Sequence, residues 1–123
     1  MKKIFLALAF LLAACNSSDS FKTGTYKMVN SPNDVAITLS FAKDKSLNAK
    51  VVNIIMGQYE VKDNTITITP GGATMMMGPE KEMEAEQIFL QMLLTIKSYK
   101  MAGNRLELIT EDEKTLLFDK VEE

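Results

Sequence analysis

The sequence contains no histidine and no tryptophan, and its one cysteine is Cys15. Histidine is the commonest general base and the commonest metal ligand near neutral pH, so its absence removes the usual starting point for acid–base or metal chemistry. The sequence also contains no motif that pairs a nucleophilic side chain with a general base. We therefore expect a protein that is not an enzyme, with no catalytic residue, no bound metal ion and no cofactor.

An excess of basic side chains is also missing. Without Lys2 and Lys3, 12 of the 14 basic side chains remain against 16 acidic ones, which gives a net charge of 12 − 16 = −4. Contacts from lysine and arginine to phosphates supply most of the affinity of proteins for nucleic acid. The composition therefore argues against a nucleic-acid partner and against electrostatic adhesion to anionic lipid.

No apolar run in the sequence reaches the length of about 20 residues that a membrane-spanning helix needs. The longest run, residues 4–14, follows Lys2 and Lys3 and is followed by the polar residues 16–20. A short basic segment before an apolar stretch of this length is typical of a secretory signal. The sequence predicts a signal peptide over residues 1–14.

The end of that run resembles the bacterial lipobox. Leu12-Ala13-Ala14-Cys15 places a leucine and two small residues before a cysteine, the residue that takes a diacylglyceryl group in bacterial lipoproteins. Two or three acyl chains, such as palmitate, hold a protein firmly on a bilayer, whereas a single chain holds it only marginally. The resemblance implies cleavage before Cys15, lipidation of Cys15 and attachment to a membrane through that lipid.

The remaining chain divides into two parts. Residues 15–22 are the lipidated cysteine and a short polar tether, and residues 23–123 have the length of one domain. Asn16 follows the cysteine, at the position where an aspartate usually retains lipoproteins in the inner membrane of enteric bacteria. For a Gram-negative source, this favours the outer membrane, facing the periplasm, over the inner membrane.

Most of the domain alternates polar and apolar residues with the period of β-strands. Gly57 is expected to break or bend the chain after residue 55, because a glycine within a strand pattern often marks a bulge. Asp63 and Asn64 tolerate positive φ and suit a hairpin turn. The expected strands are residues 24–30, 35–41, 47–55, 59–62, 65–69, 99–102, 105–110 and 114–121.

One helix is expected between residues 78 and 96. Pro70-Gly71-Gly72 is expected to end the strands before it, and Gly78-Pro79 to begin it, because proline suits the first helical turn. Acidic side chains in residues 80–86 favour the positive end of the helix dipole. The apolar stripe of this helix comprises Ala85, Ile88, Phe89, Met92, Leu93 and Ile96.

These elements predict an α+β fold. We expect a curved, partly closed antiparallel sheet of about seven or eight short strands, with one amphipathic helix packed on its open side or end. The last strands are expected to contribute Leu106, Leu108, Leu116 and Phe118 to the core.

Several short motifs in this layout resemble those of the META domain family, over about residues 24–121 of the chain. Asn53 and the later Gly57-Gln58-Tyr59 match the second half of the first family motif. Thr74-Met75-Met76-Met77-Gly78 matches its threonine–methionine segment. The other matches are Glu86-Gln87-Ile88-Phe89-Leu90 in the helix, Tyr99, the pair Leu106 and Leu108, and Leu117-Phe118.

The resemblance implies a small stress-related domain of the cell envelope, in which the motif residues have structural roles. The sequence departs from the family at Val52 and Gly78, where many members carry cysteines. The two replacements occur together, as expected if those cysteines can bridge in other members. No redox role therefore carries over to this chain. The motif residues in question are Asn53, Gly57, Tyr59, Thr74 and Met76.

Two other patterns in the sequence weakly resemble metal-binding sites. Residues 75–77 are three consecutive methionines, and with Met83 they offer the soft thioether ligands that Cu(I) prefers. Methionine is, however, also a flexible filler of cores. The acidic residues 80–86 lack the spacing of a calcium-binding loop. We therefore assign no metal ligand.

Two functions remain open from the sequence. The first is a non-enzymatic, lipid-anchored envelope protein that binds a partner protein or stabilises the envelope under stress. The alternative is a carrier, similar to secretin pilot lipoproteins, that holds an acyl chain or another apolar ligand inside the sheet. The cavity of such a carrier would be lined by residues such as Ile37, Leu39, Met92 and Leu108.

Overall fold

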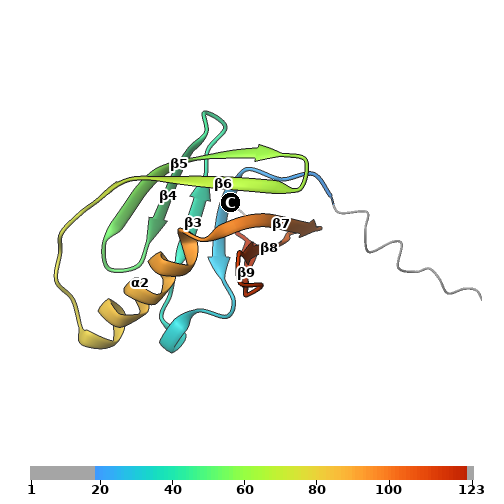
Figure 1. The fold of residues 1–123 in the computed structure, drawn as a ribbon. Helices are drawn as coiled ribbons and strands as arrows, with labels where there is room; N and C mark the ends of the chain where they lie inside the picture. Colours follow the sequence, from blue (N-terminus) through green and yellow to red (C-terminus); the bar gives the residue numbers. More distant parts are fainter. Residues whose placement is uncertain (1–18, 122–123) are drawn as a thin grey trace, which may run out of the picture.

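The computed structural model describes residues 19–121 (Figure 1). Cys15 and the predicted signal peptide lie outside the described residues. Within residues 19–121, eight antiparallel strands pair in chain order, and β2 pairs with β9 to close a barrel. The strands are β2 Gly24–Met28, β3 Thr38–Phe41, β4 Ser46–Lys50, β5 Ile54–Lys62, β6 Thr65–Ala73, β7 Ile96–Ala102, β8 Arg105–Thr110 and β9 Thr115–Lys120.

Two short helical elements complete the described chain. The 3-10 turn η2 (Pro32–Asp34) joins β2 to β3, and helix α2 (Glu80–Leu93) joins β6 to β7. An antiparallel sheet with one α-helix is thus confirmed, but the sheet is closed where the sequence predicted partial closure. No helix in this described part is long and apolar enough to cross a membrane.

Closure is weakest between β6 and β7. Within the described residues, Thr65 and Ser98 are the one pair in register between these strands, and the Tyr99 amide adds a hydrogen bond of 3.1 Å to the carbonyl of Asn64. Over its remaining length β6 pairs with β5. The barrel is therefore a continuous ring with one narrow seam.

The barrel interior is filled by alternate side chains of the strands. In β3, for example, Leu39 and Phe41 are buried while Thr38 and Ser40 are only half-buried. Fully burying a leucine or phenylalanine contributes about 1.5–3 kcal/mol. The buried apolar side chains form one connected cluster. The predicted core residues Leu106, Leu108, Leu116 and Phe118 all belong to it.

Several predicted strand boundaries are wrong. β2 ends at Met28 and not at residue 30, β3 begins at Thr38 and not at residue 35, and β7 begins at Ile96 and not at residue 99. The expected strand over residues 47–55 is broken: β4 ends at Lys50 and β5 begins at Ile54. The Pro70-Gly71-Gly72 sequence does not end the sheet, since β6 continues to Ala73. Pro70 is tolerated inside a strand because it lies opposite Gly57 at an irregularity in the β5–β6 register.

Gly57 marks that irregularity, as the sequence predicts for a bulge. A Cβ atom at residue 57 would lie 2.5 Å from the carbonyl oxygen of Thr69, which is closer than real Cβ atoms approach. The two strands can therefore meet this closely only because residue 57 is a glycine.

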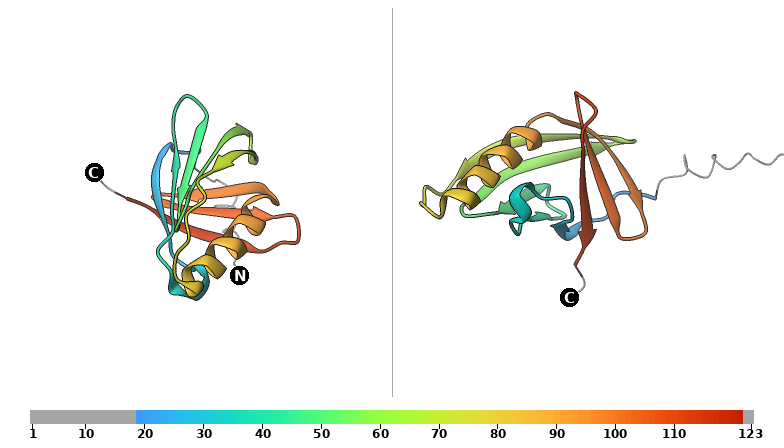
Figure 2. Two further views of the ribbon diagram at one scale, coloured as in Figure 1. Left: turned by 90° about the vertical axis from the view of Figure 1, so that its left-hand side faces the viewer. Right: turned by 90° about the horizontal axis from the view of Figure 1, so that it is seen from below.

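Helix α2 lies across one end of the barrel, away from Asp19, where the described chain begins (Figure 2). It begins directly after Pro79, as predicted, and buries Ala85, Phe89 and Leu93. This face is narrower than the predicted stripe, because Ile88 is exposed and Met92 is half-buried.

The predicted C-terminal end of the helix, at about Ile96, is wrong. The helix ends at Leu93, and the Thr95 amide donates to the carbonyl of Met92 in a tight turn. Ile96 already belongs to β7 and pairs with Thr110 of β8. Ile96, which continues the apolar spacing of the helix in the sequence, is therefore the first inward-facing residue of β7.

Candidate functional site

Asn53 lies in the turn between β4 and β5 and is a buried polar side chain, 5% exposed. Its Oδ1 accepts hydrogen bonds from the amide of Met76 (2.5 Å) and from the Thr74 hydroxyl (2.9 Å). Its Nδ2 donates to the carbonyl oxygen of Met76 (3.2 Å). One amide side chain therefore fixes both backbone groups of Met76, in the segment that leads from β6 to α2.

Glu86 of α2 completes this arrangement from the helix side. Its Oε1 accepts hydrogen bonds from the amides of Val52 (3.1 Å) and Asn53 (2.7 Å), and its Oε2 accepts one from Asn53 Nδ2 (2.8 Å). We call Asn53, Thr74, Met76 and Glu86 the junction cluster. It joins a barrel turn, the segment after β6 and the helix.

The junction cluster unites three of the five residues singled out from the family resemblance. Glu86 belongs to the helix motif of the family resemblance, but its contact with Asn53 was not predicted from the sequence. Met76 contributes only its backbone groups to these bonds, and its side chain is half-exposed. The donors and acceptors of the cluster are directed at one another, so the arrangement holds chain segments together and offers no nucleophile to a substrate.

Tyr59 and Gly57 lie elsewhere, along β5. The Tyr59 hydroxyl donates to the carbonyl of Ala42 (2.6 Å), and its ring packs edge-on against Phe41 with centroids 4.9 Å apart. Burial, and then the negative charge of Asp44, raise the pKa of Tyr59. This phenol is therefore a neutral structural group at neutral pH.

Phe21 caps the end of the barrel opposite α2. Its ring contacts three aromatic rings from three strands, at centroid distances of 5.0 Å to Phe41, 5.7 Å to Tyr59 and 5.4 Å to Tyr99. We call these four residues the mouth cluster. The sequence predicted that Phe21 belongs to a tether. No local sequence pattern indicates that this ring packs against residues so distant in the chain.

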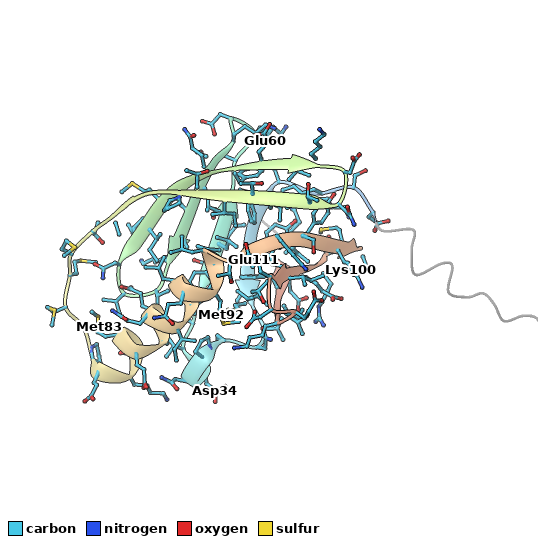
Figure 3. The ribbon with its side chains drawn as sticks, viewed as in Figure 1. Asp34, Glu60, Met83, Met92, Lys100 and Glu111 are labelled. Atoms are coloured by element: carbon cyan, nitrogen blue, oxygen red, sulfur yellow. The ribbon has the colours of Figure 1, made fainter. Side chains whose placement is uncertain are left out.

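Hollows on the outer surface of the described structure include one beside the end of α2, where Met92 and Glu111 come close (Figure 3). Two others lie on the outer face of β3 to β5 and at the Gly57 irregularity. Of the four residues expected to line a cavity, Ile37, Leu39 and Leu108 are buried in the core cluster. Met92 is half-buried, packs against that cluster and also lines the hollow beside α2.

The consecutive methionines are directed mainly at solvent. Met75 is 93% exposed and Met77 is 87% exposed. In the part of the chain that the structure describes, no group of three or more cysteine, aspartate or glutamate side chains is placed to hold a metal ion.

The fold is shared with solved structures. A protein from Burkholderia xenovorans, determined by NMR, superposes with a TM-score of 0.70 at 17% identity, covering 100% of this chain and 97% of that one. A DUF4847 family protein from Bacteroides vulgatus superposes with a TM-score of 0.63 at 17% identity, covering 84% and 96% of the two chains. At this identity the likeness concerns the fold alone.

Sequence comparison identifies the family. No curated protein matches the chain. The model of the META domain matches residues 12–123, which is nearly the whole sequence and includes every motif residue described above. The chain therefore belongs to the META domain family.

Proposed function

We propose that this META domain protein is a lipid-anchored lipoprotein of the bacterial cell envelope, which acts as a stress-related binding or structural module and not as an enzyme. The observation that carries the proposal is Leu12-Ala13-Ala14-Cys15 at the end of an apolar run. Lipid on Cys15 would hold the domain at a membrane surface. Asn16 favours the outer membrane, facing the periplasm.

The junction cluster supports a structural or binding role over catalysis. Its buried amide and its half-buried carboxylate are occupied by backbone groups of the same chain. A general acid or base has to reach a substrate proton, and these groups are not free to do so. A partner protein of the envelope would instead meet the outer surface of the barrel.

The carrier alternative has weaker support. An apolar ligand needs a cavity, and the interior side chains of the barrel form one connected, buried cluster. The narrow seam between β6 and β7 is the feature that favours the alternative, because a single residue pair would separate most easily. We therefore place the carrier second.

The anchoring proposal is tested by metabolic labelling with an alkyne analogue of palmitate. We expect the wild-type protein to be labelled and to sediment with membranes, and Cys15→Ser to lose the label and be released. A matched control, Cys15→Ser with Ser18→Cys, restores a thiol three residues outside the motif and should also remain unlabelled. Labelling of the serine variant would show that the proposed anchor is wrong.

A further inference from the structure

The first described residues, Asp19 to Lys22, are fastened to the barrel. The Asp19 amide donates to the carbonyl of Met101 (2.8 Å), and the Asp19 carboxylate accepts a hydrogen bond from the amide of Gly103 (2.7 Å). Lys22 Nζ donates to the carbonyl of Gly103 (2.7 Å). A segment expected to be a free tether is thus held at two points beside the β7–β8 turn.

The ring of Phe21 deepens this attachment. It lies in the mouth cluster between residues of β3, β5 and β7. Aromatic pairs at such centroid distances contribute about 0.5–1.5 kcal/mol each beyond the burial of their area. The chain therefore leaves the barrel in a defined direction.

Three turns surround the mouth cluster. The Tyr59 hydroxyl reaches Ala42, in the turn between β3 and β4, and the Tyr99 hydroxyl reaches the carbonyl of Asp63, in the turn between β5 and β6 (3.1 Å). Gly103, in the turn between β7 and β8, holds Asp19. We call this the mouth end. Lys100 lies on its side of the molecule, whereas Met83 of α2 and Asp34 lie at the far end (Figure 3).

Only three residues separate Cys15 from Asp19. Four consecutive Cα–Cα steps reach at most about 14 Å even when fully extended. A lipid on Cys15 therefore cannot sit far from the mouth end. Because Asp19 is fixed to the barrel, a short connection constrains the orientation of the domain as well as its height above the bilayer.

We propose that the mouth end rests on the lipid headgroups of the anchoring membrane, so that α2 and the methionines 75–77 face away from it. This inference rests on the proposed lipidation of Cys15. The turns of the mouth end and the last residue of β5 expose polar and charged side chains such as Lys43, Lys45 and Lys62, which suits contact with headgroups. Most of the large exposed apolar side chains, including Met75 and Met77, lie on other parts of the chain.

Orientation can be measured because lipidated Cys15 leaves no other native thiol to label. Asn64→Cys places a thiol in a mouth-end turn, and Gln87→Cys places one on the exposed side of α2. Each lipidated variant is labelled with a fluorophore and incorporated into phosphatidylcholine vesicles that contain headgroup spin-labelled lipid. We expect quenching at residue 64 to exceed quenching at residue 87 several-fold. Equal quenching, or the reverse order, overturns the proposal.

A second experiment keeps the fold intact but removes the constraint that the short connection to Cys15 places on the orientation of the domain. A flexible Gly-Ser linker of about 20 residues, inserted between residues 18 and 19, allows the domain to tumble above the membrane. Quenching at residue 64 should then fall to the level found at residue 87. If the linker leaves a strong difference, the short connection does not set the orientation. If the original variants do not associate with vesicles at all, the lipid anchor itself is wrong and the orientation falls with it.

Discussion

Asn53 shows how one buried polar residue can hold three segments of a chain. An unsatisfied buried donor or acceptor costs about 1–3 kcal/mol, so such a residue persists only where each of its polar atoms has a partner. Asn53 meets this condition through Met76, Thr74 and Glu86. The amide is required here because it both donates to Glu86 and accepts from Met76.

Asn53→Asp should therefore destabilise the protein although the shape of the side chain hardly changes. The substitution removes the donor to Glu86 and places a second carboxylate where the donor lay, 2.8 Å from Oε2. We expect a loss of at least about 2 kcal/mol in the free energy of unfolding in urea at pH 7.

The matched control for this variant is Asn48→Asp. Asn48 is exposed on β4, where a surface substitution changes stability by about 0.5 kcal/mol or less. Equal effects of the two substitutions would show that the junction cluster does not stabilise the fold.

The sequence predicts part of this residue-level picture. The Gly57 irregularity follows from a glycine inside a strand pattern, and Asn53 was singled out through the family resemblance. The role of Glu86 could not be predicted, because an acidic residue near the start of a helix is equally explained by the helix dipole. Its partner Asn53 lies 33 residues away in the sequence, and only the folded chain brings them together.

At the level of elements, the turn before β5 and the start of α2 meet at Val52 and Gly78. A Cβ atom built at residue 78 would lie 3.7 Å from the Cβ of Val52. The Cβ atoms of a disulfide are about 3.5–4.5 Å apart. The two positions that depart together from the family pattern are thus neighbours in space.

Val52→Cys combined with Gly78→Cys should consequently form a disulfide without rearrangement of the backbone. The bridge would close a loop of about 27 residues and add about 3 kcal/mol to the stability of the oxidised protein. The variant is made in a Cys15→Ser background, and thermal unfolding is compared with and without reductant. Each single cysteine variant serves as a control that should not respond to reductant. A double variant that stays reduced in air would contradict the proximity of the two residues.

The boundaries of the elements were harder to predict than the elements themselves. Residues 47–55 have the apolar content of one strand, and the break at residues 51–53 depends on contacts with Glu86 that lie outside this stretch. Ile96 continues the spacing of the helix, but its pairing with Thr110 places it in β7. In both cases a long-range contact overrides a local pattern.

On the scale of the whole molecule, the barrel is closed at one end by α2 and at the other by Phe21. Phe21 lies 20 or more positions in the sequence from each of the three rings that it contacts. The alternation within strands predicts an antiparallel sheet, but the pairing of β2 with β9 joins residues about 90 positions apart, such as Met28 and Phe118. Sequence patterns alone therefore predicted a partly closed sheet, whereas the structure is a closed barrel.

Tyr26 lies inside this closed barrel and makes the stability of the whole molecule sensitive to alkaline pH. Burial, and then the neighbouring Tyr59, raise the pKa of Tyr26 to about 12, whereas a tyrosine in an unfolded chain titrates near pH 10. Above about pH 10 the unfolded state thus loses a proton that the folded state keeps, so stability falls as pH rises. Below about pH 10 the protonated Tyr26 makes its full contribution to the free energy of unfolding.

Tyr26→Phe should accordingly make the stability of the protein less dependent on pH above about pH 10. The hydroxyl donates to the carbonyl of Lys22 (2.5 Å), so its removal should cost about 1 kcal/mol at pH 7. Between pH 9 and 11.5, however, the urea midpoint of the variant should fall less steeply than that of the wild type. Phe118→Leu, a core change without a titrating group, should lower the midpoint at every pH and keep the wild-type slope. If Tyr26→Phe kept that slope as well, another group would have to account for the alkaline loss of stability.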